Sequence, residues 1–189
     1  MAGSSGSRVH MLIGRIGVIG CAQLLHQVKN DNAVSKTLYG DNDLVISLPT
    51  QLSNVAFMEL HTGFGKYELP LIACLLKSSP NLCTLIINSC CDINKDEELN
   101  FDKEKYWEAL DLANIVLLSH LEKFELNEFG GTWIERRLVK HFLVRATKLK
   151  EMFICSSKNL QACINLKTEI SKELRKTQKA SPSSMLMFI

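Results

Sequence analysis

The sequence of 189 residues has little net charge and no apolar run long enough to cross a membrane. Because the formal net charge is only +2, the total charge predicts no general attraction to nucleic acid or to an anionic membrane. Near the N-terminus, Arg15 interrupts the apolar run, and no A-x-A cleavage pattern follows it. We therefore expect neither a signal peptide nor a membrane partner, and a cytoplasmic or nuclear location.

Metal-binding cysteine patterns are absent as well. The seven cysteines contain neither C-x2-C nor a Cys/His pairing with the spacing of zinc ligands. Their odd number favours reduced thiols over a disulfide framework. Cys74 and Cys83 lie in apolar periodic segments, where a thiol packs as a small hydrophobic group. We expect no metal ion and no other cofactor.

The sequence also lacks the common motifs of catalysis and nucleotide binding. Three glycines recur at every third residue over 14–20, but this spacing matches no phosphate-binding loop and no strand clearly precedes it. His61, His120 and His141 have no recognisable Ser or Cys context. The acidic residues of Asp92–Glu108 are spread over an expected loop, where no apolar pocket would shift a pKa. We therefore expect no enzymatic activity.

What the sequence does contain is an internal repeat. Leu76–Ile87 (LKSSPNLCTLII) and Leu143–Ile154 (LVRATKLKEMFI) share the pattern L-x5-L-x2-L/M-x-I, displaced by 67 residues. The last part of this pattern occurs four times, as Val55, Met58, Leu60; Leu82, Leu85, Ile87; Leu121, Phe124, Leu126; and Leu149, Met152, Ile154. The first anchors are 27, 39 and 28 residues apart. Two of these intervals match the period of leucine-rich repeats, and the middle one carries an insertion.

Helical patterns lie between the repeats. Pro70 suits the first turn of a helix over Leu69–Lys77. Thr132 and Glu135 form a T-x-x-E capping box that predicts the start of a second helix, which runs to about Ala146. Further helices are expected around Lys103–Leu110 and over Asn165–Lys176. Strands are expected at Leu44–Leu48 and in the terminal MLMFI, and we expect the terminal strand to dock on the sheet.

These patterns predict an α/β fold: a leucine-rich-repeat-like solenoid with a parallel β-sheet on one face and helices on the other. We divide the chain into a poorly defined N-terminal segment (1–52), leucine-rich-repeat-like repeats (53–112) with an acidic insertion (92–105), and a C-terminal domain (113–189).

Strand alternation predicts a row of outward-facing side chains beside the inward anchors. This candidate partner-binding surface consists of Phe57, Glu59, His61, Thr84, Ile86, Asn88, Lys123, Glu125, Asn127, Glu151, Phe153 and Cys155. Apolar anchors within a polar frame are typical of protein-binding faces. The alternative is that these are ordinary outward residues covered by the insertion, the N-terminal segment or the chain end.

The segment Leu118–Ile154 (LSHLEKFELNEFGGTWIERRLVKHFLVRATKLKEMFI) resembles the FBD domain found near the C-terminus of many plant F-box/leucine-rich-repeat proteins. The shared features are a strand, a Gly-rich corner, a helix, the L-x5-L bridge and a second strand. PNLCTLIIN at Pro80–Asn88, the Tyr106-Trp107 pair and KASPSSMLMF at Lys179–Phe188 support the resemblance, although Lys179 stands where arginine is common. By this resemblance, 113–189 is an FBD-like domain.

The resemblance implies a non-catalytic adaptor that recognises a target protein within an SCF-type ubiquitin ligase. No F-box pattern occurs in residues 1–52, although LLHQV at Leu24–Val28 is similar to the connector that precedes the family's repeats. The chain is thus expected to be a fragment or a truncated relative, with a ligase adaptor as partner only if a longer form carries an F-box. The family supplies no catalytic residues to carry over.

A basic helix face that binds nucleic acid is the alternative function, and a non-functional fragment is a further one. The basic residues concerned are Arg136, Arg137, Lys140, Arg145, Lys148 and Lys150. The stacking aromatic residues of the common single-strand-binding modules are missing, which favours a solvated helix face.

Overall fold

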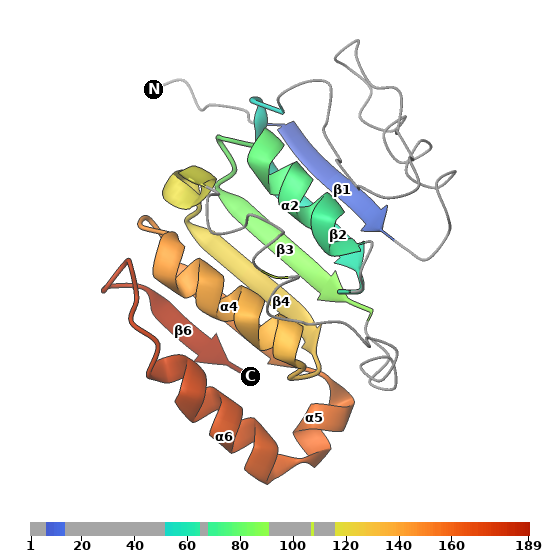
Figure 1. Cartoon of the computed structure of the whole chain (residues 1–189), viewed down its shortest axis with the longest axis vertical. Coiled ribbons are helices and arrows are strands. Elements are labelled where there is room, and N and C mark those ends of the chain that lie inside the picture. Colours follow the sequence, from blue (N-terminus) through green and yellow to red (C-terminus); the bar gives the residue numbers. More distant parts are fainter. Residues whose placement is uncertain (1–6, 14–51, 65–67, 91–106, 108–115) are drawn as a thin grey trace.

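The computed structural model describes residues 7–13, 52–64, 68–90, 107 and 116–189. In chain order the elements are β1 (Ser7–Ile13), β2 (Val55–Thr62), α2 (Glu68–Ser78), β3 (Thr84–Ser89), the 3-10 helix η3 (Val116–His120), β4 (Lys123–Phe129), α4 (Trp133–Arg145), β5 (Glu151–Ser156), α5 (Lys158–Ala162), α6 (Ile164–Arg175) and β6 (Met185–Phe188). The six strands form one parallel sheet and follow each other in chain order (Figure 1). The predicted α/β class with a parallel sheet is confirmed.

The repeat anchors face the helices and form the core. Helices α2 and α4 lie over the same face of the sheet in Figure 1. The strand residues Met58, Leu60, Leu85, Ile87, Phe124, Leu126, Met152 and Ile154 are all 0% exposed. The Phe124 ring lies 4.4 Å from the Phe142 ring of α4, measured between centroids. Burying side chains of this size stabilises the fold by about 1.5–3 kcal/mol each.

The first anchor of each repeat closes the same tight turn. Its backbone N–H donates to the carbonyl oxygen three residues earlier in all four copies: Val55 to Leu52 (3.1 Å), Leu82 to Ser79 (3.2 Å), Leu121 to Leu118 (3.3 Å) and Leu149 to Ala146 (3.3 Å). The common sequence spacing therefore corresponds to a common corner that delivers each chain segment into its strand.

Local helix signals predicted the helix boundaries closely. Thr132 caps α4, with its hydroxyl accepting a hydrogen bond from the Glu135 N–H and the Glu135 carboxylate accepting one from the Thr132 N–H. The helices expected over 69–77 and 165–176 are α2 and α6, shifted by at most one residue at each end. The terminal MLMFI docks as β6, in register with β5. Each of these predictions is confirmed.

Three elements were not predicted from the sequence: β1, the 3-10 helix η3 and α5. Ser7–Ile13 forms β1, which pairs in parallel with β2, so a strand does precede the glycines of 14–20. The helix α5 was also not predicted; Ser157 caps it by accepting from the Leu160 N–H.

Several predictions fall outside the described residues. These are the glycines, the strand at Leu44–Leu48 and the acidic insertion 92–105. Of the helix expected at 103–110, only Trp107 is described; it is helical and 8% exposed. In the part of the chain that the structure describes, no helix combines the length and apolar character needed to cross a membrane.

The Gly-rich corner between β4 and α4 requires one glycine. Gly131 has φ of 79°, and a Cβ added there would lie 2.7 Å from Ile170 Cδ1 of α6. Ile170 is 1% exposed, so its side chain has little room to move. Gly131 therefore lets α6 pack closely on the corner of the FBD-like segment.

We expect Gly131→Ala to lower the free energy of unfolding by about 1–2 kcal/mol, because the backbone conformation is unfavourable for alanine and the methyl group meets Ile170. Gly130→Ala is the matched control, since its added Cβ would meet its nearest neighbour, Glu135 Oε2, only at 3.4 Å. That change should stay within about 0.5 kcal/mol in urea unfolding followed by circular dichroism. Equal losses for both variants would contradict the role given to Gly131.

Candidate functional site

The predicted outward-facing residues align in rows across the sheet. One row joins Phe57, Thr84, Lys123 and Glu151; the next joins Glu59, Ile86, Glu125 and Phe153; the third joins His61, Asn88 and Asn127. Parallel strands in this register place residues of equal position side by side, about 4.8 Å apart. The rows bring together eleven of the twelve residues predicted from the sequence; the twelfth, Cys155, has no register partner on β4, where the pairing shifts. We call this surface the outward face.

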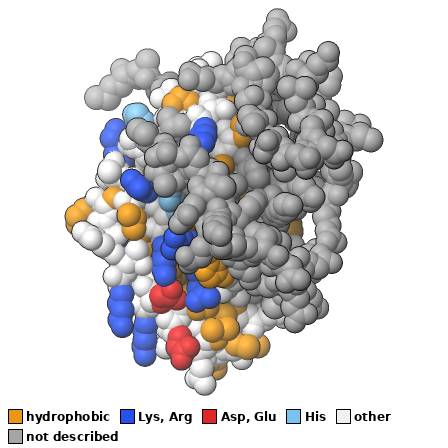
Figure 2. All heavy atoms as spheres, in the orientation of Figure 1, with side chains coloured by type: hydrophobic (Ala, Val, Ile, Leu, Met, Phe, Trp, Pro, Cys, Tyr) orange, Lys and Arg blue, Asp and Glu red, His pale blue; other side chains and the backbone are white. Residues whose placement is uncertain are grey.

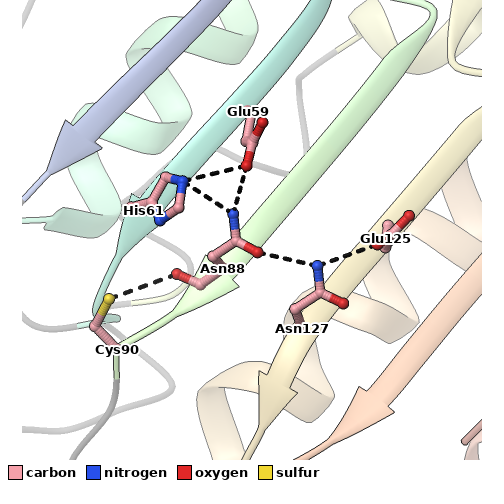
Figure 3. Close-up of polar contacts among 6 residues, drawn as sticks. All are labelled: Glu59, His61, Asn88, Cys90, Glu125 and Asn127. Carbon is pink, nitrogen blue, oxygen red and sulfur yellow. Dashed lines mark hydrogen bonds and ion pairs between the residues drawn. The ribbon is translucent and has the colours of Figure 1, made fainter.

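A chain of side-chain hydrogen bonds crosses three strands of the outward face (Figure 3). Asn127 Nδ2 donates to Asn88 Oδ1 (3.0 Å) and to Glu125 Oε1 (3.1 Å). Asn88 Nδ2 donates to Glu59 Oε1 (2.9 Å) and lies 3.2 Å from His61 Nε2. His61 Nε2 is also 3.2 Å from Glu59 Oε1. We call these five residues the polar ladder; its mutual bonds hold the polar side chains in one arrangement.

Phe153 is the largest apolar group on the β5 part of this face. It is half-buried, and Lys123 Nζ lies 5.1 Å from the centroid of its ring, within the range of a cation–π contact. The same ammonium group lies 3.5 Å from Glu125 Oε2, which is next to Phe153 in the register. Phe153 therefore sits in a charged frame that joins it to the polar ladder.

Strand β6 extends the outward face with two residues that the sequence analysis did not select. Met185 pairs with Glu151 and Met187 with Phe153. Met185 is 54% exposed, whereas Leu186 between them is 7% exposed and belongs to the core. The alternation within MLMFI was the available signal, but it becomes meaningful only once the register of the docked strand is known.

The end of β4 departs from the regular pattern. Glu128 has φ of 55°, a conformation that is uncommon for a residue other than glycine, and the β4–β5 register shifts between Leu126 and Phe129. Burial, and then the carboxylates of Glu125 and Glu128, raise the pKa of the Cys155 thiol above its usual range. A protonated thiol is a poor nucleophile, so Cys155 contributes shape rather than reactivity to this edge.

The charged side chains of the outward face are partly exposed. The side chains of Glu59 and Glu125 are each 24% exposed, and those of Lys123 and His61 are 38% and 45% exposed. These values lie between those of core residues and those of free surface side chains. Contact with a partner through this face would therefore involve limited rearrangement of side chains that are already ordered.

The basic helix face is largely engaged within the protein. Arg136 and Lys140 of α4 both bind Glu173 of α6, and Lys150 Nζ lies 2.7 Å from Glu122 Oε2. Arg137 lies 6.0 Å from the Trp133 ring. Figure 2 shows basic side chains scattered along the helix side, with acidic side chains among the lower ones. This arrangement disfavours a continuous phosphate-binding surface.

The histidine, cysteine and acidic side chains outside the outward face do not gather into one site in the described ranges. Within these ranges, no group of three or more His, Cys, Asp or Glu side chains is placed to hold a metal ion. Cys74, Cys83, Cys90, Cys155 and Cys163 are not joined in disulfides.

The fold and the outward face together define an α/β protein of strand and helix units that presents an ordered, in-register surface. Residues 116–154 match the FBD family. The resemblance to plant F-box/FBD and F-box/leucine-rich-repeat proteins is confirmed, and the FBD match includes β4, the Gly-rich corner, α4 and most of β5.

Curated relatives come from Arabidopsis thaliana. A protein named as an FBD-associated F-box protein is 29% identical over 139 residues, covering 74% of this chain and 31% of the relative. One named as an F-box/LRR-repeat protein is 33% identical over 107 residues, which cover 51% of this chain and 23% of the relative. A second FBD-associated F-box protein is 32% identical over 114 residues, which cover 60% of this chain and 25% of the relative. The chain thus spans between 23% and 31% of the length of these relatives. No solved structure matches the chain significantly.

Proposed function

We propose that this chain is a non-catalytic protein-interaction module whose target-recognition surface is the outward face. The observation that carries this proposal is the row of Glu59, Ile86, Glu125 and Phe153, in which acidic and apolar side chains alternate across four strands. The polar ladder holds part of this row in place, which lowers the entropy lost on binding. The relatives are named as F-box proteins with FBD or leucine-rich-repeat regions, and this likeness supports a role in protein recognition.

We also infer that the units form a short leucine-rich-repeat-like solenoid. The support is the common corner at each first anchor, the sequential order of the strands and the shared register. The division into repeats (53–112) and an FBD-like domain (113–189) is proposed on the same basis. Because β3 and β4 pair directly, both parts would contribute to one continuous outward face.

Ubiquitin-ligase recruitment is proposed only for a form that carries an F-box. The relatives are named as F-box proteins, and this chain spans no more than 31% of their length. Residues 1–52 show no F-box pattern, so the region with the repeats would supply target recognition without ligase recruitment. The cytoplasmic or nuclear location stays a prediction.

Affinity capture from a plant extract tests two proposals: that this chain recognises a target protein, and that it does not recruit a ubiquitin ligase by itself. The chain is immobilised, and retained proteins are identified by mass spectrometry beside a bead-only control. We expect a reproducible target protein and no ligase adaptor subunits. Reproducible capture of adaptor subunits would contradict the absence of an F-box function in this chain.

Phe153→Ala should weaken target binding about tenfold or more, because aromatic side chains near the centre of an interface carry much of the binding energy. The free energy of unfolding should change by less than about 1 kcal/mol, because Phe153 is half-buried outside the core. Val144→Ala is the matched control, since Val144 is 49% exposed on α4, away from the outward face. Target capture, combined with urea unfolding, separates the two effects. A large loss of stability in Phe153→Ala would instead show that Phe153 is a structural residue.

A further inference from the structure

A second surface lies at the edge of the sheet formed by β6, between α6 and the end of that strand. It is an open groove of about 440 Å³, lined by Gln161 of α5, by Phe188 of β6 and by the α6 residues Ile164, Lys167, Thr168, Ser171, Lys172 and Arg175. Figure 1 shows α6 alongside β6 at this edge. The groove is separate from the outward face, because Phe188 pairs with the inward-facing Ile154.

The groove carries positive charge without an acidic residue in its lining. Lys167, Lys172 and Arg175 are the three cations, and Lys167 Nζ lies 5.9 Å from the Phe188 ring. Helix geometry places Glu173 on another side of α6, where Arg136 and Lys140 of α4 bind it. Of the two acidic residues of α6, Glu173 stabilises the packing on α4 and Glu169 lies outside the groove lining, whereas three cations face the groove.

The edge of the sheet formed by β6 adjoins the groove, which Phe188 lines. Met185 N–H donates to the Lys150 carbonyl (2.8 Å), and Ile189 N–H donates to the Ile154 carbonyl (2.9 Å), so alternate residues of β6 bond to β5. The peptide groups of Leu186 and Phe188 then point to the opposite edge. Among the described strands, β6 is the last of the sheet, and none pairs with that edge. An unpaired edge of this kind is a template for an added strand.

We propose that this groove binds an extended acidic peptide segment of a partner protein. The peptide backbone pairs with Leu186 and Phe188, its carboxylates lie against Lys167, Lys172 and Arg175, and an apolar side chain packs on Phe188 and Ile164. Ile164 is 72% exposed, which suits an apolar contact at the groove's rim. Charge complementarity alone would also suit a nucleic acid, but only a peptide supplies the N–H and C=O groups that extend a sheet.

The probe for this proposal is a fluorescein-labelled eight-residue peptide with the order Glu-Glu-Val-Val-Glu-Glu-Val-Val, which places both glutamate and valine on each face of an extended strand. Its binding to the full chain is measured by fluorescence anisotropy. We expect saturable binding that weakens as salt rises, since the charges are at the surface. The triple variant Lys167→Glu, Lys172→Glu, Arg175→Glu should weaken it about tenfold or more, because three attractions become repulsions. The matched control reverses three exposed lysines outside the groove, Lys148, Lys158 and Lys176, and should change the affinity less than about threefold.

Two altered probes test the mode of binding. The same peptide with alternate backbone nitrogens methylated should bind at least about tenfold more weakly, because methylation removes the donors that pair with an edge strand. A single-stranded oligonucleotide of equal charge should bind more weakly than the peptide. The proposal is overturned if the peptide fails to bind at about 1 mM, if the triple variant binds it as the control does, or if the methylated peptide or the oligonucleotide binds equally well. Phe153→Ala should leave peptide binding unchanged, which separates this site from the outward face.

Discussion

Replacing Glu135 with alanine is expected to lower the free energy of unfolding by about 3–5 kcal/mol, the largest effect that we predict for any substitution of a polar side chain here. The Glu135 side chain is 0% exposed, and its carboxylate accepts hydrogen bonds from the Ser89 hydroxyl (3.0 Å), the Gly130 N–H (3.2 Å), the Thr132 N–H (2.9 Å) and the Thr132 hydroxyl (2.9 Å). Alanine would leave these donors without an acceptor in the interior. Each buried donor left unpaired costs about 1–3 kcal/mol.

The location of Glu135 explains why its loss would affect the whole fold. Ser89 ends β3 in the repeat region, whereas Gly130 and Thr132 form the corner that begins α4 in the FBD-matching segment. One carboxylate therefore joins a strand end, a corner and a helix start. Its removal should loosen the attachment of α4 to the sheet as well as the first turn of the helix.

Urea unfolding followed by circular dichroism measures this effect. Glu135→Gln is the graded variant: it keeps one oxygen acceptor but replaces the other by an NH2 group, so we expect a loss of about 2 kcal/mol. Glu169→Ala, at an exposed position on α6, is the matched control and should stay within about 0.5 kcal/mol. A loss below about 1 kcal/mol for Glu135→Ala would show that water or rearranged groups replace the carboxylate.

His141 is expected to make the fold less stable in mild acid. Burial, and then the charges of Arg145 and Arg137, lower the pKa of His141 from 6.5 to about 4. Its Nε2 is buried, and no described residue bonds to it; the ring lies against Trp107 and Phe142, at 6.2 Å and 6.1 Å between centroids. Protonation would place a charge among these rings and close to two arginines, so the folded protein disfavours it.

The direction of the pH effect follows from these two pKa values. Above pH 6.5 the histidine is neutral in both states, and its contribution to stability is fully present. As the pH falls from 6.5 to about 4, the unfolded chain binds a proton that the folded chain does not, so stability is lost. At about 1.36 kcal/mol for each pH unit, the total loss is about 3 kcal/mol, of which about 2 kcal/mol is lost by pH 5.

The free energy of unfolding of the wild type and His141→Leu should be compared between pH 7 and 5. Leucine cannot be protonated, so the variant should lose most of the slope over this range, whatever its stability at pH 7. Exposed His120 supplies the control: His120→Gln should keep the slope. The pKa of Glu173 is lowered, chiefly by its hydrogen bond from Lys140, so its contribution is lost only below its usual value of 4.5, outside this range. If the free energy of unfolding of His141→Leu depends on pH as strongly as that of the wild type, His141 is not the source of the pH effect.

Local sequence patterns predicted much of the fold, because their physical causes are local. The anchors at L-x-x-L-x-L spacing alternate in burial along each strand, and the Thr132–Glu135 pair defines the start of α4 through two hydrogen bonds within one turn. The same alternation placed Ile86 and Phe153 on the outward face. By contrast, Ser7–Ile13 becomes a strand by pairing with β2, which no local pattern indicates. Its register joins Ser7 to Val55 and Arg8 to Phe57, which are 48 and 49 residues apart in the chain.

The sequence by itself determined the number and spacing of the repeat anchors, the direction of their side chains and the caps of the principal helices, since each depends on residues within about one turn or strand. Only the tertiary structure decided how these units meet. Register placed Asn88 beside Asn127 and Met187 beside Phe153, and packing brought Ser89 to Glu135 and turned three α6 cations toward the edge of β6. These are contacts between residues far apart in the chain, and their geometry is set by the closure of the core rather than by any local preference.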